Sequence, residues 1–374
     1  MKKGYIRLLI FEFLICIVLF LNSFVWNILS NHIMNIFLLG LIILFRVFFG
    51  LEKDRHRYSK IVLMDVFIFL LVFFMLYYLF GIIITFARPG NYFTVEGFRN
   101  FILPTFCFVI LREYLRYNVM CKASGNKITI VFSIIMFIWI DITSVIFYTK
   151  FVSSYNIFMF IALTLMPSIS NNIAYSYITL RVGYKPVILF DLVMSLYYYL
   201  MPIVPNPNDY LASIIKLFVP LILCYRILVF FRKSRDEEID RYYMKPRYGW
   251  LVFSCAITVM LVYFTSGYFS YWAIAVASGS MSPNINKGDV AIIKKIDDVS
   301  KIKKGDVLAF NYENVTIIHR VINIARDGDK YYFYTKGDAN KNEDNFSIEE
   351  DMIVGITKVR VPWVGIPTVW LNEL

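Results

Sequence analysis

The sequence predicts an α-helical polytopic membrane domain of about nine transmembrane helices, followed by a small, mostly antiparallel β domain. Of the 374 residues, 59% are hydrophobic and 17% are charged, against roughly 45–50% and about 25% in an ordinary soluble domain. Several apolar runs reach about 20 residues, the length that crosses a hydrocarbon core. From residue 277 onward the pattern changes to short alternating stretches punctuated by Gly-Asp, which are typical of β-strands.

Apolar segments bounded by charges, Pro or Gly are the candidate membrane spans. We therefore expect a polytopic domain of unknown role at 1–245, a transmembrane anchor helix at 246–276 and an extracytoplasmic domain at 277–374. The candidate spans lie at about 8–28, 33–50, 61–86, 98–115, 128–148, 155–180, 187–204, 211–231 and 249–270.

The positive charge of the chain predicts its orientation. The formal net charge is +11, and all of the excess falls within residues 1–276. If the N-terminus is cytoplasmic, most loop Lys and Arg residues lie inside, including the group from Arg112 to Lys127 with Arg116, which begins at the end of the fourth span, as the positive-inside rule requires. This predicts a multi-pass cell-membrane protein with its C-terminal domain outside, in contact with lipid. Because the charge is explained in this way, we expect no nucleic-acid partner.

The polar residues of the membrane domain give few functional signals. Asp141 lies near the middle of its span, and we expect it to hydrogen-bond a Tyr, Ser or Asn of a neighbouring helix rather than to form a proton or ion path. All 5 cysteines lie in this half of the chain without CxxC spacing, which argues against a zinc ribbon or a disulfide scaffold. We expect no metal and no cofactor.

The C-terminal domain is expected to contain strands near 288–293, 307–312, 315–325, 330–335 and 353–361. The run Arg326-Asp327-Gly328-Asp329 between two of them is a hairpin signal. His319 lies in the third of these strands and is the only histidine of the domain.

Ser280 and His319 together suggest hydroxyl-nucleophile chemistry. A serine nucleophile needs a base with a pKa near neutrality, which histidine supplies. Taken alone, a Ser-Gly-Ser turn is more often a linker and a single strand histidine is more often structural. A third group would orient the base, and both Asp338 and Asp344 of the next loop are candidates.

The same acidic loop has an alternative interpretation as a calcium site. The oxygens of Asp338, Asn340, Asn342 and Asp344 alternate as in part of an EF-hand loop. The sixth-position Gly and the closing bidentate Glu of that loop are missing, which argues against this interpretation.

The order of motifs resembles the type I signal peptidases, serine peptidase family S26. Ser278-Gly279-Ser280-Met281 follows a membrane helix, and His319-Arg320-Val321 and then Thr335-Lys336-Gly337-Asp338 come later. Because His-Arg-Val replaces Lys-Arg-Val, the similarity is to the endoplasmic-reticulum and archaeal-type branch with a Ser-His site. The resemblance covers about residues 277–374, so the polytopic region would be fused to a domain of signal-peptidase type.

The resemblance implies a role for each residue that matches the motifs. Ser280 would be the nucleophile, His319 the general base and Asp344 the residue that orients it, with Asp338 supporting the site. The Ser280 N–H and the Ser278 hydroxyl would donate hydrogen bonds to the oxyanion. Met281 would belong to the same substrate-binding segment.

The expected function is that of a membrane-bound serine endopeptidase that cleaves N-terminal signal peptides from exported preproteins. Its substrates would carry small residues before the cut, and the export machinery is a candidate partner. The alternative is a polytopic transporter or assembly scaffold whose outer domain binds peptides without cleaving them.

Overall fold

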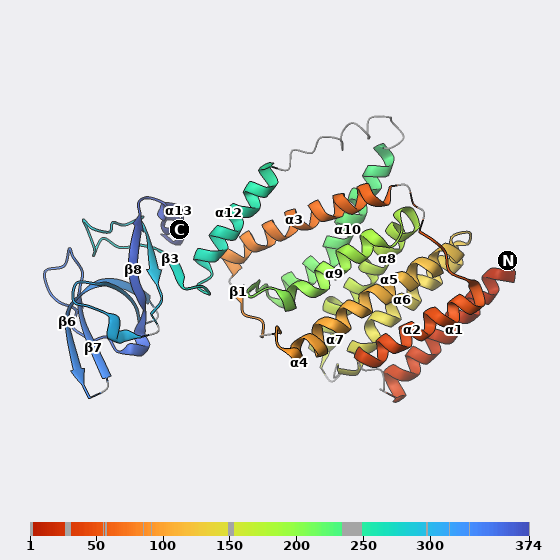
Figure 1. The fold of residues 1–374 in the computed structure, drawn as a ribbon, viewed down its shortest axis with the longest axis horizontal. Coiled ribbons are helices and arrows are strands. Elements are labelled where there is room, and N and C mark those ends of the chain that lie inside the picture. The colour runs from red at the N-terminus through yellow and green to blue at the C-terminus, as the bar shows by residue number, and fades with distance from the viewer. Residues whose placement is uncertain are drawn as a thin grey trace. The chain divides into compact units, whose positions relative to one another are not determined.

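The computed structural model describes residues 3–26, 31–54, 56, 58–84, 86–90, 92–148, 153–233, 249–296, 298–313, 315–328 and 330–373. The chain divides into two compact units, residues 1–253 and 254–374 (Figure 1). The first is helical and the second contains the β-sheet, and each has its own apolar clusters.

Long helices form the first unit. A short β1 (Phe86–Ala87) pairs with β2 (Val204–Pro205). A π-helical turn at Phe98–Ile102 joins α4 (Val95–Gly97) to α5. A second π-helical turn, at Ile161–Leu165, joins α7 (Ser154–Phe160) to α8. The long helices are α1 (Lys3–Leu21), α2 (Asn31–Phe49), α3 (Ser59–Ile84), α5 (Leu103–Ala123), α6 (Lys127–Tyr148), α8 (Met166–Val182), α9 (Lys185–Leu200) and α10 (Asp209–Lys233).

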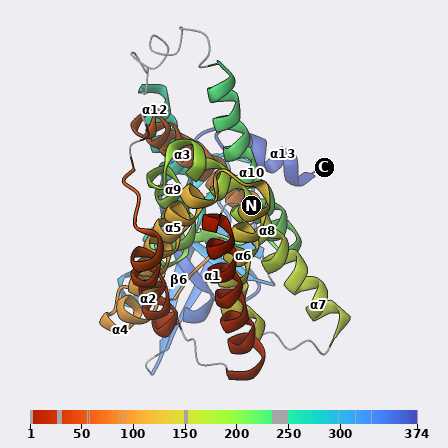
Figure 2. The same ribbon diagram turned by 90° about the vertical axis from the view of Figure 1, so that its right-hand side faces the viewer.

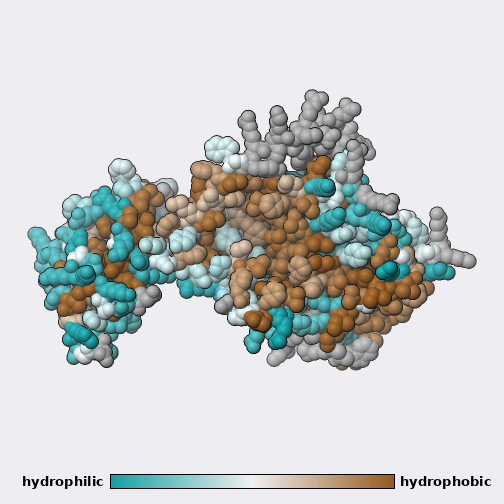
Figure 3. Space-filling model, viewed as in Figure 1, coloured by the Kyte–Doolittle hydropathy of each residue, from teal (hydrophilic) through white to brown (hydrophobic). Residues whose placement is uncertain are grey.

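Apolar side chains cover much of the outside of this unit, as Figure 3 shows. Within the described residues, 5 helices are long and apolar enough to cross a membrane, and α12 (Gly249–Thr265) is apolar but shorter. The 5 are Gly4–Val25, His32–Phe49, Ser59–Ile82, Ser154–Val182 and Asp209–Phe231. The prediction of about nine spans therefore remains a prediction, since α5 carries buried charges and α9 has only 16 residues.

Two apolar clusters hold the helical unit together. One joins α1, α2, α5 and α6, and the other joins α3, α8, α9 and α10. Helix α5 packs against α2, α6, α8 and α9, so it lies between the clusters. In the end-on view of Figure 2, α5 and α6 lie among the other helices.

The prediction that Arg112 and Arg116 are loop charges is wrong. Both lie inside α5 and are buried, because carboxylates compensate their charge: Glu113 of the same helix pairs with Arg116, and Asp141 and Asp191 of neighbouring helices pair with Arg112. Asp141 makes the expected hydrogen bonds, accepting from Ser168 Oγ at 3.1 Å and Asn172 Nδ2 at 2.6 Å. Its ion pair with Arg112 was not anticipated.

The second unit contains a six-stranded sheet of order β3-β4-β8-β5-β6-β7, in which every neighbouring pair is antiparallel. The antiparallel β region was expected from the sequence. The strands are β3 (Tyr271–Ala275), β4 (Val290–Lys294), β5 (Val307–Tyr312), β6 (Val315–Asp327), β7 (Lys330–Lys336) and β8 (Ile353–Val361), and α13 (Ile366–Glu373) follows.

Strand β3 was missed because residues 271–275 were assigned to the end of the anchor segment. Helix α12 ends at Thr265, and Gly267 then adopts a positive φ of 63°. Glycine tolerates that conformation without steric cost. The chain therefore turns and enters the sheet beside β4.

The sheet separates two apolar clusters. Successive strand residues point to opposite faces, so Ala309 joins the cluster of Met281 and Ile318, while Leu308 and Phe310 join the other. Both faces of β5 and β6 are thus covered, which holds the middle of β6 in a fixed position.

Candidate active site

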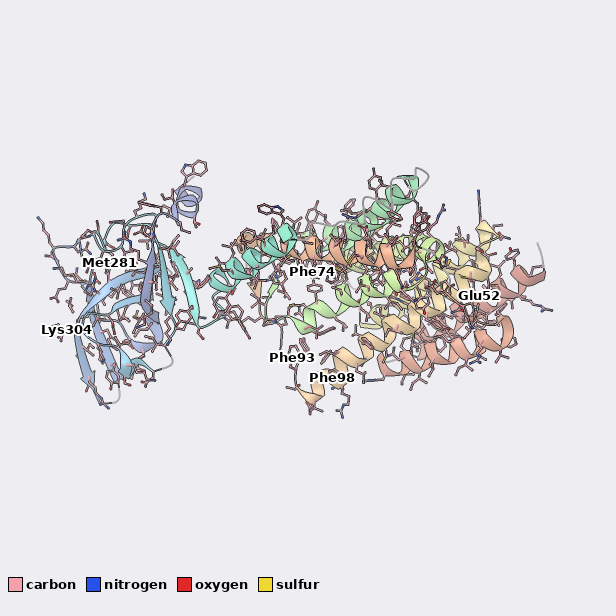
Figure 4. The ribbon with its side chains drawn as sticks, turned by 45° about the horizontal axis from the view of Figure 1, so that its top comes forward. Glu52, Phe74, Phe93, Phe98, Met281 and Lys304 are labelled. Atoms are coloured by element: carbon pink, nitrogen blue, oxygen red, sulfur yellow. The ribbon has the colours of Figure 1, made fainter. Side chains whose placement is uncertain are left out.

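Ser280 lies in a tight turn that follows β3. The Ser282 N–H donates to the Gly279 carbonyl at 3.1 Å, and the Ile285 N–H donates to the Met281 carbonyl at 2.9 Å. The Met281 side chain is only 1% exposed and packs into the apolar cluster beneath the sheet (labelled in Figure 4). Burying a methionine stabilises a fold by roughly 1.5–3 kcal/mol, so Met281 fixes the serine that precedes it.

His319 lies in β6, opposite Leu308 of β5. Its side chain is buried, and its ring packs against the Phe310 ring in a T-shaped arrangement with centroids 6.4 Å apart. The apolar surroundings restrict the imidazole, so its two nitrogens have defined directions.

A chain of contacts runs from Ser280 through His319 to Asp344. Ser280 Oγ lies 3.1 Å from His319 Nε2, and Asp344 Oδ2 lies 2.7 Å from His319 Nδ1. Both distances are within hydrogen-bond range. Because an ionised carboxylate only accepts, Nδ1 is the donor to Asp344, and in a neutral ring Nε2 is then the acceptor that faces the Ser280 hydroxyl.

Asp344 is held by the end of β7. Its N–H donates to the Thr335 carbonyl at 3.0 Å, and Thr335 Oγ1 donates to Asp344 Oδ2 at 2.6 Å. Thr335 is fully buried, so it fixes the carboxylate oxygen that faces the imidazole. The role of Thr335 was not foreseen, although it begins the quoted Thr-Lys-Gly-Asp motif.

Asp338 contacts Arg320 and not the imidazole. Arg320 Nε donates to Oδ1 at 2.8 Å and Nη2 donates to Oδ2 at 2.7 Å, while Asn284 Nδ2 donates to Oδ2 at 2.8 Å. The hydrogen bonds from Arg320 hold the pKa of the Asp338 carboxyl below its ordinary value. Arg320 also donates to the Gly305 carbonyl at 2.9 Å, so Asp338 helps to fasten the loop that carries Asp344.

The acidic loop therefore offers two carboxylates with different partners. Asp344 faces His319, and Asp338 faces Arg320. Among the described residues, no group of three or more His, Cys, Asp and Glu side chains is arranged to hold a metal ion. The two carboxylates of the calcium interpretation thus each have another partner.

The acidic loop also touches the serine turn directly. The Ala339 N–H donates to the Ser280 carbonyl at 2.9 Å. A Cβ at Gly337 would lie 2.6 Å from the same oxygen, closer than any side chain tolerates. Glycine at 337 thus permits the approach that brings Asp344 and Ser280 to one imidazole.

Ser278 and the Ser280 backbone lie at the exposed side of the site. Ser278 Oγ is 3.2 Å from Ser280 Oγ, and Ser278 is exposed. Within the part of the chain that the structure describes, the Ser280 N–H donates to no other backbone carbonyl.

Comparisons with known proteins find similarity in this part of the chain. Residues 248–331 match the family described as "Signal peptidase, peptidase S26". The C-terminal part of the chain is similar to signal peptidases. Signal peptidase I W of Bacillus subtilis is 37% identical over 86 residues, which are 23% of this chain and 45% of that protein.

Eukaryotic relatives match over a slightly longer stretch. The signal peptidase complex catalytic subunit SEC11 of Plasmodium falciparum is 30% identical over 110 residues, 27% of this chain and 58% of the relative. SEC11 of Clavispora lusitaniae is 32% identical over 110 residues and matches over 65% of its length. The chain thus covers about half to two thirds of these relatives, and the matches account for about a quarter of the chain.

Proposed function

We propose that the β unit cleaves N-terminal signal peptides from exported preproteins, as the catalytic part of a membrane-bound serine endopeptidase. The observation that carries the proposal is the contact chain from Ser280 through His319 to Asp344. The similarity of the same segment to signal peptidases supports the choice of substrate. A Ser-His pair is the catalytic combination that the resemblance to the endoplasmic-reticulum and archaeal-type branch of the signal peptidases implies.

In the proposed reaction, Ser280 Oγ attacks the carbonyl carbon of the scissile peptide bond. His319 Nε2 takes the serine proton as the new C–O bond forms. The imidazolium then donates that proton to the leaving amine, which releases the mature protein. Water, deprotonated by the same nitrogen, hydrolyses the acyl-enzyme and frees the signal peptide.

The developing oxyanion is stabilised by donors beside Ser280. The Ser280 N–H and the Ser278 hydroxyl are the proposed pair, in keeping with their position at the serine oxygen. A preorganised donor of this kind contributes roughly 2.7–4 kcal/mol in acyl transfer.

The two aspartates have different proposed roles. Asp344 holds the Nδ1–H tautomer and stabilises the imidazolium by its negative charge. Asp338 is a positioning residue, which acts through Arg320 and the loop rather than on the reacting atoms.

We further propose that the polytopic half anchors the enzyme in the cell membrane, with the N-terminus in the cytoplasm and the β unit on the extracytoplasmic face. A cleavage site becomes accessible there once the apolar core of a signal peptide has entered the bilayer. Substrates carry small residues before the cut, and the export machinery would deliver them.

Processing in isolated membranes tests the proposal. Membranes with the wild-type chain, His319→Ala or the matched control His56→Ala receive a preprotein with an Ala-x-Ala site, and gel shift and N-terminal sequencing report the product. We expect mature protein with the wild type and with His56→Ala, cut after the small-x-small sequence. Normal processing by His319→Ala, or none by the wild type with several preproteins, would contradict the proposal.

A further inference from the structure

Strand β7 lies at the edge of the sheet, and the segment that carries Asp344 runs along its outer side. Strand β6 pairs with β7 on the inner side (Figure 1). On the outer side, Phe333 and Ile348 exchange two backbone hydrogen bonds of 3.0 and 2.8 Å, and the Asp344 N–H donates to the Thr335 carbonyl. Backbone pairing therefore places Asp344 beside Thr335.

The Thr335 side chain makes a second contact with Asp344. Thr335 Oγ1 donates to Asp344 Oδ2 at 2.6 Å, and the same oxygen lies 2.7 Å from His319 Nδ1. Among the residues that the structure describes, none donates to the other carboxylate oxygen, Oδ1. Two donors thus fix a single oxygen, so a rotation of the carboxylate would break both hydrogen bonds.

The surroundings of the two side chains make the hydroxyl difficult to replace. Thr335 is fully buried, so no water takes the place of its hydroxyl. The Asp344 side chain is 10% exposed, and water can therefore compete for its carboxylate from the open side. Hydrogen bonds to an ionised acceptor are short and stronger than neutral ones, which favours the orientation that Thr335 imposes.

The methyl group and the hydroxyl of Thr335 have separate contacts to make. Alternation along β7 places Thr335 on the same face as Phe333, which belongs to the apolar cluster of Leu308 and Phe310. A branched side chain suits a strand for its shape alone, and Thr357 of β8 is an example. Its Oγ1 is buried and has no hydrogen-bond partner among the described residues. Thr335 differs because its hydroxyl donates to Asp344.

We propose that Thr335 is a positioning residue for peptide-bond cleavage, a fourth member of the contact chain that joins Ser280, His319 and Asp344. The inference rests on the proposed function of the β unit. The Thr335 hydroxyl holds Asp344 Oδ2 against the imidazole, so that Nε2 stays directed at the Ser280 hydroxyl. Thr335 touches neither the substrate nor the reacting atoms, and its effect falls on the rate of cleavage rather than on preprotein binding.

Single-turnover processing of a preprotein by the full chain in membranes compares Thr335→Val with Thr335→Ser. Valine keeps the branched shape and loses the hydroxyl, whereas serine keeps the hydroxyl and loses the methyl group. We expect Thr335→Val to cleave about 10- to 100-fold more slowly than the wild type, because a misplacement of about 1 Å costs up to about 100-fold. Thr335→Ser should cleave near the wild-type rate.

A purely structural role predicts the opposite order of the two variants. Serine leaves a cavity where the buried methyl group was, whereas valine fills the site. The preprotein concentration that gives half the maximal rate should be the same in all variants, because the fully buried Thr335 cannot touch the preprotein.

Two further variants make the comparison specific to this hydroxyl. Thr357→Val is the matched control, since it is the same substitution in the same sheet on a hydroxyl without a described partner, and it should keep the wild-type rate. Thr335→Ala covers the case in which the valine variant does not fold. Thr335→Ala and Thr335→Ser both lack the methyl group and differ only in the hydroxyl, so Thr335→Ser should cleave faster.

Three outcomes would overturn the inference. They are a wild-type rate in Thr335→Val, a Thr335→Val that cleaves faster than Thr335→Ser, and a Thr335→Ala as fast as Thr335→Ser. A wild-type rate in Thr335→Val beside an inactive His319→Ala would overturn this inference alone. A wild type that cleaves no preprotein would overturn the proposed function and this inference with it.

Discussion

Replacing Asp344 by asparagine separates the charge of this residue from its geometry. Asp344 Oδ2 accepts from both His319 Nδ1 and Thr335 Oγ1. An asparagine Oδ1 in the same place can accept both hydrogen bonds, so the tautomer of His319 is kept. What the variant loses is the negative charge that faces the imidazolium formed during the reaction.

The size of the loss follows from the distance and the burial. Nδ1 and Oδ2 are 2.7 Å apart, and both side chains are about one tenth exposed. Unit charges about 4 Å apart, at an effective dielectric constant of about 20, attract by about 4 kcal/mol. We therefore expect kcat for preprotein processing to fall roughly 10³-fold.

A single-turnover processing assay with excess enzyme measures this effect without interference from product release. Asp338→Asn is the matched control, because it is the same chemical change in the same loop on a carboxylate that contacts Arg320. Its rate should stay within about tenfold of the wild type. An Asp344→Asn rate within tenfold of the wild type would refute the proposed role of this charge.

Three further predictions concern the same domain. Met281→Ala should destabilise the β unit by about 2–5 kcal/mol, as expected for a fully buried methionine. A denaturant melt followed by tryptophan fluorescence would measure this loss. An unchanged midpoint would contradict the role of Met281 in fixing the Ser280 turn. The Arg320–Asp338 pair should contribute about 1 kcal/mol or less, because Arg320 is one third exposed. Arg320 lowers the pKa of Asp338. The stability difference between wild type and Asp338→Asn should therefore persist above the ordinary Asp pKa of about 3.9 and vanish as pH falls through the lowered pKa. A stability difference that grows in acid would be inconsistent with this prediction. Metal chelators should leave processing unchanged, and a loss of activity that calcium restores would favour the calcium interpretation.

The strands of the β unit could be predicted closely, because alternation and turn residues are local signals. The expected strands at 307–312 and 353–361 coincide with β5 and β8. The hairpin after β6 also forms where the Asp-Gly signal lies, with Asp327 paired to Lys330. Strand β3 was not predictable from composition, because an apolar strand after an apolar helix continues the same pattern.

The choice between Asp338 and Asp344 required tertiary structure. Both lie in one loop, and either could reach a strand histidine on sequence spacing alone. The hydrogen bond from the Asp344 N–H to the Thr335 carbonyl directs Asp344 toward His319. Arg320 donates to Asp338 and so holds it away from the imidazole. Neither contact has a sequence signature of its own.

The buried charges of the helical unit were hidden for a different reason. Arg112 and Arg116 stand at the polar end of an apolar run, where the positive-inside rule treats basic residues as loop charges. Their carboxylate partners come from α5, α6 and α9. Helix pairing of this kind is not encoded in the hydropathy of any single segment.

The most direct test of the central claim is the rate of preprotein processing by Ser280→Ala. Ser282→Ala serves as the control, since its hydroxyl donates to Asn286 and lies in the same turn. The account predicts that Ser280→Ala remains in the membrane and releases no mature protein, while Ser282→Ala continues to process. Wild-type processing by Ser280→Ala would show that this serine is not the nucleophile.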